Sequence, residues 1–120
     1  MKIVKVPDED RAGVISYGSP PQVELEIEVI PRKGEIVLRI SNPNLAKVEI
    51  TNEVELYEYV GFWQKLNLGL VFLEKRIVLI PGETVEQRIP VELTPGEYRV
   101  VKFAYVKGAR VRVEKEFTLR

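Results

Sequence analysis

The side chains that most enzymes use for catalysis are nearly absent from this chain of 120 residues, which contains no cysteine and no histidine. Ser16, Ser19 and Ser41 therefore have no imidazole to activate them, and no Gly-x-Ser-x-Gly turn presents one of them as a nucleophile. The usual zinc ligands and the glycine-rich phosphate-binding loops are missing as well. Two glutamates can serve as acid and base, but 16 glutamates make any such pairing unspecific. We therefore predict a protein that is not an enzyme and uses no cofactor or metal.

The side chains best suited to recognition are aromatic and close together in the sequence: Tyr57, Tyr59, Phe62 and Trp63. Aromatic side chains on a rigid strand bury much area with few rotatable bonds, so this group is a candidate partner-binding surface. Tyr57 and Tyr59 should point the same way, opposite to Leu56. The alternative is structural: Trp63 and one tyrosine close the core under a hairpin, and the other tyrosine is ordinary strand surface.

Three carboxylates, Glu24, Glu26 and Glu28, alternate with apolar residues and form an acidic row. Such a row resembles a cation site or the footprint of a basic partner. Neighbours on one face of a strand lie about 7 Å apart, however, and converge poorly on a single ion. We expect instead a solvated face that pairs with Arg110 and Arg112, because the first and last strands of a sandwich are often neighbours.

The elements that must position these residues are β-strands, because apolar and polar residues alternate along most of the chain. Turn signals separate the alternating segments, and no credible helix occurs. The predicted strands span residues 2–6, 23–29, 35–41, 47–51, 53–60, 62–66, 76–80, 85–91, 98–106 and 109–119. Residues 47–60 are either two strands or one long strand with a bulge near Asn52. Residues 67–74 are a strand or an irregular crossing.

The alternation fails at two lysines. Lys102 and Lys115 fall where an inward residue is due, which predicts a bulge or a strand end past the core at each position. The strand over residues 98–106 is also apolar on both faces. Either a bulge near Val101 swaps the faces, or the outer face is covered by the N-terminal segment or by a second subunit.

One short segment indicates the architecture: Leu93-Thr94-Pro95-Gly96-Glu97-Tyr98. A Pro-Gly turn before a strand-opening tyrosine is typical of the corner where the chain passes between the two sheets of an immunoglobulin-like sandwich. The ring is buried there and its hydroxyl bonds to main chain a few residues upstream. Leu93, Pro95, Gly96 and Tyr98 are therefore the predicted structural corner, and the fold class is an all-β, immunoglobulin-like antiparallel β-sandwich of about 7–9 strands.

From about residue 22 onward, the order of these signals resembles a family of bacterial Ig-like domains of unassigned function. The resembling segments are residues 40–44, 61–63, 79–83, 93–102 and 116–117. Phe62 stands where members of that family tend to carry a polar residue. The layout is also similar, more weakly, to intracellular proteinase inhibitors of bacilli. Both resemblances imply a sandwich, and neither carries over a catalytic residue.

The length of the chain limits the number of domains, and its net charge limits the classes of partner that it can bind. The chain is long enough for one core, so we expect a single domain: an N-terminal edge strand and loop over residues 1–21 and an Ig-like sandwich over residues 22–120. Eighteen basic and eighteen acidic residues cancel, which disfavours nucleic acid as a partner. No apolar run is long enough to insert into a membrane. The high glutamate, lysine and arginine content with a single methionine favours a thermophilic source.

The function predicted from these observations is that of a non-catalytic interaction or structural module with an unknown protein partner. Two alternatives stay open. One is a proteinase inhibitor acting through an exposed loop, either Arg11 to Tyr17 or the crossing at residues 66–72. The other is a subunit of a surface or filament assembly, in which edge strands join copies into a homo-oligomer. As written the chain reads as cytoplasmic, and as extracytoplasmic if a signal peptide was removed.

Overall fold

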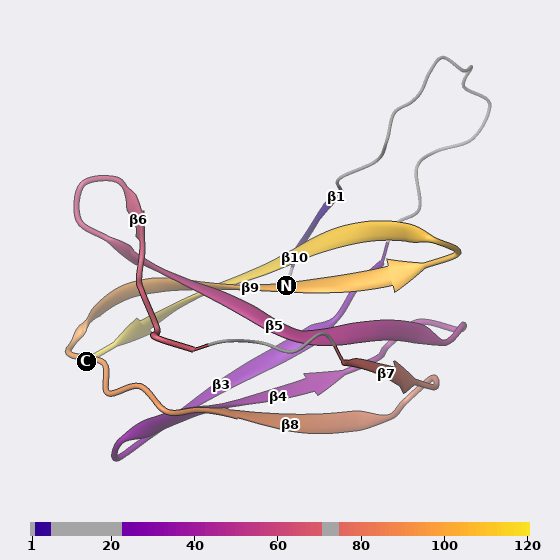
Figure 1. Cartoon of the computed structure of the whole chain (residues 1–120), viewed down its shortest axis with the longest axis horizontal. Helices are drawn as coiled ribbons and strands as arrows, with labels where there is room; N and C mark the ends of the chain where they lie inside the picture. The colour runs from indigo at the N-terminus through magenta and orange to yellow at the C-terminus, as the bar shows by residue number, and fades with distance from the viewer. Residues whose placement is uncertain (1, 6–22, 71–74) are drawn as a thin grey trace.

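The structure, a computed structural model, describes residues 2–5, 23–70 and 75–120, and every regular element in these ranges is a β-strand. One sheet contains β1 (Lys2–Lys5), β5 (Val48–Tyr59), β6 (Trp63–Lys65), β7 (Arg76–Leu79), β9 (Gly96–Val106) and β10 (Ala109–Leu119). The other contains β3 (Glu26–Arg32), β4 (Glu35–Ser41) and β8 (Thr84–Ile89). Figure 1 shows the two sheets as stacked layers. The predicted all-β antiparallel sandwich is confirmed.

All neighbouring strands are antiparallel. The larger sheet has the order β1-β10-β9-β5-β6, with β7 pairing the first part of β5, and the smaller sheet has the order β3-β4-β8. The core lies between the sheets, because alternate residues of each strand turn inward and leave water. The largest apolar side chains buried there are Leu25, Ile36, Leu38, Ile40, Ile50, Leu56, Leu79 and Ile89.

Strand β5 is one long strand with an irregularity, which is the second of the two predicted arrangements. Its register against β9 shifts between Ile50 and Val54. The first part of β5 pairs with β7 and the last part with β6. The bulge at residues 51–53 therefore joins two halves of one strand that have different neighbours.

The prediction of a face-swapping bulge near Val101 is wrong. Strand β9 alternates without a break, so that Tyr98, Val100 and Ala104 face the core. Val101 and Phe103 lie on the outer face and are nevertheless buried. The guanidinium of Arg110, from the neighbouring strand β10, lies 3.8 Å from the centroid of the Phe103 ring. Arginine stems can cover apolar surface while the charge stays in water, and here they help to shield the outer face.

The acidic row does not pair with the last strand, because β3 and β10 belong to different sheets. Of this row, Glu28 pairs within the smaller sheet: it lies 3.4 Å from the Arg39 guanidinium of the adjacent strand β4. Arg110 instead lies 3.5 Å from Glu53, and Arg112 pairs with Glu114 on its own strand.

The Leu93–Tyr98 segment has the geometry of a tyrosine corner. Tyr98 is 2% exposed, and its hydroxyl donates to the Thr94 carbonyl over 2.6 Å. Its ring stacks on Phe117 of β10 with 5.6 Å between centroids. A Cβ at Gly96 would lie 3.6 Å from the Tyr98 ring, which is an ordinary van der Waals contact, so Gly96 packs against the ring without a steric need for glycine. Leu93 packs against the core cluster and Pro95 is exposed.

Asn42 is fully buried and forms hydrogen bonds to several segments that lie close to it. Its side-chain amide donates to the carbonyls of Ala46 and Leu79 at 3.0 and 2.9 Å. Its Oδ1 accepts from the Asn44 backbone N–H at 2.8 Å. Its backbone exchanges hydrogen bonds with the β7–β8 turn, from its own N–H to the Glu83 carbonyl and from the Gly82 N–H to its carbonyl. Asn42, which follows β4 of the smaller sheet, thus links that sheet by hydrogen bonds to β7 of the larger sheet and to the β7–β8 turn.

Candidate functional site

The β5–β6 hairpin extends from one end of the larger sheet (Figure 1) and carries most of the predicted contact residues. Tyr59, Val60 and Phe62 are 46%, 48% and 62% exposed, which is unusual for apolar side chains gathered within four positions. Gly61 sits between them with φ of 95°, a conformation that glycine adopts at little cost. The Val60 N–H donates to the Phe62 carbonyl and closes the turn. The turn therefore presents these three side chains together.

Trp63 lies on the outer face of the larger sheet, and the interpretation that it closes the core under the hairpin is wrong. It pairs across the hairpin with Tyr59, and the two rings meet edge to face with centroids 5.1 Å apart. The guanidinium of Arg99, which projects outward from β9, lies 4.3 Å from the centroid of the Trp63 ring. Both contacts hold the half-buried indole as a platform beneath the exposed turn.

Tyr57 lies on the same outer face, where a hydrogen bond to a neighbouring side chain holds its ring in place. Its hydroxyl donates to Glu55 Oε1 over 2.8 Å, and Lys65 Nζ lies 3.4 Å from the other oxygen of that carboxylate. Partial burial, and then the hydrogen bond to Glu55, raise the pKa of the Tyr57 hydroxyl. The structure thus brings Tyr57, Tyr59 and Trp63 onto one face, with Phe62 at its tip.

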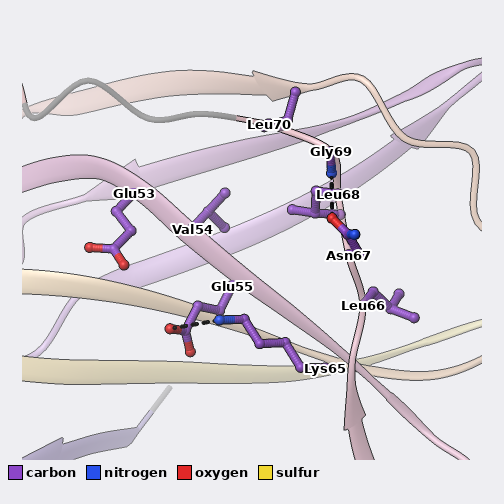
Figure 2. Close-up of a pocket in the computed structure, with 9 residues that line it drawn as sticks. All are labelled: Glu53, Val54, Glu55, Lys65, Leu66, Asn67, Leu68, Gly69 and Leu70. Atoms are coloured by element: carbon purple, nitrogen blue, oxygen red, sulfur yellow. Dashed lines mark hydrogen bonds and ion pairs between the residues drawn. The ribbon is translucent and has the colours of Figure 1, made fainter.

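A groove of about 420 Å³ runs beside this face, between β5 and the segment that follows β6. Figure 2 shows its lining: Glu53, Val54, Glu55, Lys65, Leu66, Asn67, Leu68, Gly69 and Leu70. Leu66 and Leu68 pack against the core cluster, and the Leu66 N–H donates to the Leu56 carbonyl. Leu66 and Leu68 therefore anchor the start of this segment to the sandwich, and residues 71 and 72 of the considered crossing lie outside the described residues. The other loop considered for protease inhibition, Arg11 to Tyr17, lies outside the described residues.

Lys102 plays a part that the sequence did not reveal. It projects inward from β9 and is fully buried. Its Nζ donates to the carbonyls of Thr51 and Glu53 at 2.8 and 2.9 Å and to Gln87 Oε1 of β8 at 2.7 Å. Gln87 in turn donates from Nε2 to the Asn52 carbonyl at 2.7 Å. Two side chains therefore bond all three carbonyls of the β5 bulge.

The environment of Lys102 also changes its proton affinity. Burial lowers the pKa of the amine to about 7, and the nearby Glu53 carboxylate opposes that change. The prediction of a bulge or a strand end at Lys102 is wrong: β9 keeps its register through this residue, and the irregularity lies in β5 opposite. The available signal was a lysine at an inward position; in the structure it faces a strand with two extra residues between Ile50 and Val54.

In the described part of the chain, no three histidine, cysteine, aspartate or glutamate side chains are grouped closely enough to hold a metal ion. Residues 2–5, 23–70 and 75–120 include no helix long and apolar enough to cross a membrane. The outer face and the hairpin together form an aromatic surface with charged side chains at its edges.

A family model described as a bacterial Ig-like domain matches residues 15–118. No curated protein matches the chain. The matched range begins after β1, so the strand that pairs with the edge of β10 precedes the family's domain.

Proposed function

Because the chain belongs to the bacterial Ig-like domain family, we propose that it is a non-catalytic binding module whose contact surface is the β5–β6 hairpin. The observation that supports this most is the exposure of Tyr59, Val60 and Phe62 over the fixed Trp63 platform. Apolar side chains in water offer binding free energy when a partner covers them. A rigid turn keeps the entropy lost on binding small. The partner class that fits such a surface is another protein with an apolar recess.

Site-specific photo-crosslinking tests this proposal. A benzophenone side chain is placed at position 62 and, as a matched control, at position 45, since Leu45 is 100% exposed at another turn. In the native host we expect a discrete adduct from position 62 and none from position 45. Tyr59→Ser should reduce the adduct, because Tyr59 helps to fix the platform. Equal labelling from both positions, or none from position 62, contradicts the proposal.

A second candidate function is self-association through β7, which one observation favours. Ile77, Val78 and Ile80 are exposed in and just after an edge strand of the larger sheet. Edge strands usually carry charges that block pairing with another chain, as Glu26, Glu28 and Arg32 do in β3. Light scattering over a range of concentrations tests the idea: a dimer that Val78→Lys dissociates supports it, and a monomer at every concentration refutes it.

A further inference from the structure

Strand β6 lies at the end of the larger sheet and has one free edge. Its neighbour is β5, and in the part of the chain that the structure describes no other strand pairs with it. The Leu66 N–H donates to the Leu56 carbonyl, so Leu66 and Gln64, two residues before it, direct their main-chain groups toward β5. Because these directions alternate along a strand, Trp63 and Lys65 direct their N–H and C=O groups away from β5, toward the free edge.

We propose that this edge pairs with the same edge of a second copy of the chain, in an antiparallel register centred on Gln64. Trp63 of each copy then lies opposite Lys65 of the other, and each such pair exchanges both of its outward N–H···O bonds. The two larger sheets join into one sheet across a two-fold axis. The inference rests on the proposed function, because it names a second copy as the partner that covers the hairpin.

The side chains agree with the register that the main chain sets. Residues directly opposite each other in an antiparallel pair lie on the same face of the sheet. Two positions from the centre, Phe62 of one copy meets Leu66 of the other on the inner face. Farther out, Val60 approaches Leu68 of the other copy. Phe62 and Val60 are 62% and 48% exposed, whereas the two leucines already pack against the core cluster, so the pairing covers apolar side chains with apolar side chains.

The groove beside β6 supplies the recess that the hairpin tip requires. Leu66 and Leu68 belong to the lining drawn in Figure 2, so the tip of the second copy arrives where the groove of about 420 Å³ lies. A two-fold axis makes the contact reciprocal: each tip reaches the groove of the other copy. Both copies therefore cover their exposed tips in the same interface.

The charges along the edge also permit this pairing. A lysine on an edge strand usually prevents contact with another chain. In this register, however, Lys65 lies beside the Trp63 ring of the other copy, whose face attracts a cation. The Lys65 side chain is 58% exposed and lies 3.4 Å from Glu55 of its own chain, so its ammonium stays hydrated and paired. At the centre two neutral Gln64 amides meet, and each can donate to the other.

The interface is small, so the dimer should be weak. A covered aromatic side chain buries about 150–250 Å², and the tips and edges of two copies together bury on the order of 1,000 Å². That area is near the lower limit for a specific interface. We therefore expect a dimer that forms at high protein concentration and dissociates on dilution.

Charge changes at Gln64 test the register. Gln64→Lys places two ammonium groups opposite each other across the axis, whereas within one chain the exposed lysine faces Glu58 of β5. Light scattering of the purified full chain should show a dimer for the wild type and monomers for Gln64→Lys and Gln64→Glu alone. An equimolar mixture of the two variants should recover a dimer that contains one of each. Val78→Lys, at the edge of β7, is the matched control and should leave the wild-type dimer intact.

A single introduced cysteine gives a second test, since the chain has none of its own. The Cα atoms of opposed residues in a non-hydrogen-bonded pair are about 4.5 Å apart, within the range of about 4.4–6.8 Å that a disulfide spans. Gln64→Cys should therefore form a covalent dimer rapidly on mild oxidation. Leu45→Cys, at a fully exposed turn, should form little.

Three results would overturn the inference: a monomer at every concentration, a dimer that Gln64→Lys leaves intact, or equal disulfide formation from positions 64 and 45. A purified monomer whose position 62 crosslinks to a different protein in the native host would also overturn it, while the proposed binding function of the hairpin would stand. Absence of any adduct from position 62 would instead contradict that proposed function.

Discussion

Removing the Tyr98 hydroxyl tests whether the corner stabilises the sandwich as its geometry indicates. Tyr98→Phe keeps the ring and its contact with Phe117 but deletes the donor to the Thr94 carbonyl. The bond is short, at 2.6 Å, and part-buried, so water replaces the lost donor only in part. An unsatisfied acceptor costs about 1–3 kcal/mol, and the partial exposure of Thr94 places the expected loss near the lower end, at about 1–2 kcal/mol.

The rest of the corner's contribution comes from the ring. Tyr98→Ala also removes a buried aromatic side chain, which typically costs about 3–5 kcal/mol. The two variants together separate the hydrogen bond from the packing. Phe103→Leu serves as a comparison, since Phe103 is buried on the outer face and not between the sheets.

Urea unfolding followed by circular dichroism measures these losses. With a slope of about 1–3 kcal/mol per molar urea, Tyr98→Phe should lower the midpoint by several tenths of a molar unit or more, at an unchanged slope. A stability within about 0.5 kcal/mol of the wild type would refute the reasoning, because that is the range of an inconsequential surface substitution.

Further outcomes follow from the same structure. Asn42→Ala should cost about 2–4 kcal/mol in urea unfolding, because it strips the donors from the Ala46 and Leu79 carbonyls, whereas Asn67→Ala, at an exposed turn, should cost less than about 1 kcal/mol. The unfolded chain holds the Lys102 proton up to pH 10.5 and the folded chain only to about 7. The free energy of unfolding should therefore rise with pH across that window, by on the order of 3–5 kcal/mol, and lose this rise in Lys102→Met; parallel curves would contradict it. Phe62→Ser should change stability by less than about 0.5 kcal/mol, since the side chain contacts water, and a larger loss would place it in the fold and not on a binding surface. A thermophilic source remains a proposal, supported by ion pairs such as Arg99 with Glu114 and Glu116; a thermal midpoint above about 65 °C would agree with it, and one within the mesophilic range of about 45–65 °C would not.

Local patterns predicted the strands and the corner because their physical causes are local. The strands predicted over residues 35–41 and 109–119 match β4 and β10 without change. The Pro-Gly turn and the tyrosine that follows it lie within four positions, so the Tyr98–Thr94 bond needs no information from distant segments. The predicted strand over residues 23–29 ended too early: β3 continues to Arg32 and contains Pro31, because an edge strand tolerates the missing N–H.

The predictions that failed concern which strands are neighbours in a sheet and how they are aligned. The acidic row was paired with β10 because strand order was assumed, whereas the structure places β4 beside it. The outward position of Trp63 follows from its register against Tyr59, which the turn at Gly61 sets. The role of Lys102 could not be predicted without knowing that it faces the β5 bulge, whose carbonyls need hydrogen-bond donors from outside the sheet ladder. Sequence alone placed the contact residues together but did not assign their face.

The position of Trp63 is the claim on which the binding surface depends most directly, and the chain's single tryptophan makes it measurable. Acrylamide quenching of intrinsic fluorescence in the folded state reports how far the indole is open to solvent. A half-exposed ring on the outer face, between Tyr59 and Arg99, predicts clear quenching before any unfolding. Emission that stays blue-shifted and is unquenched until the protein denatures would place the ring between the sheets and remove the proposed platform.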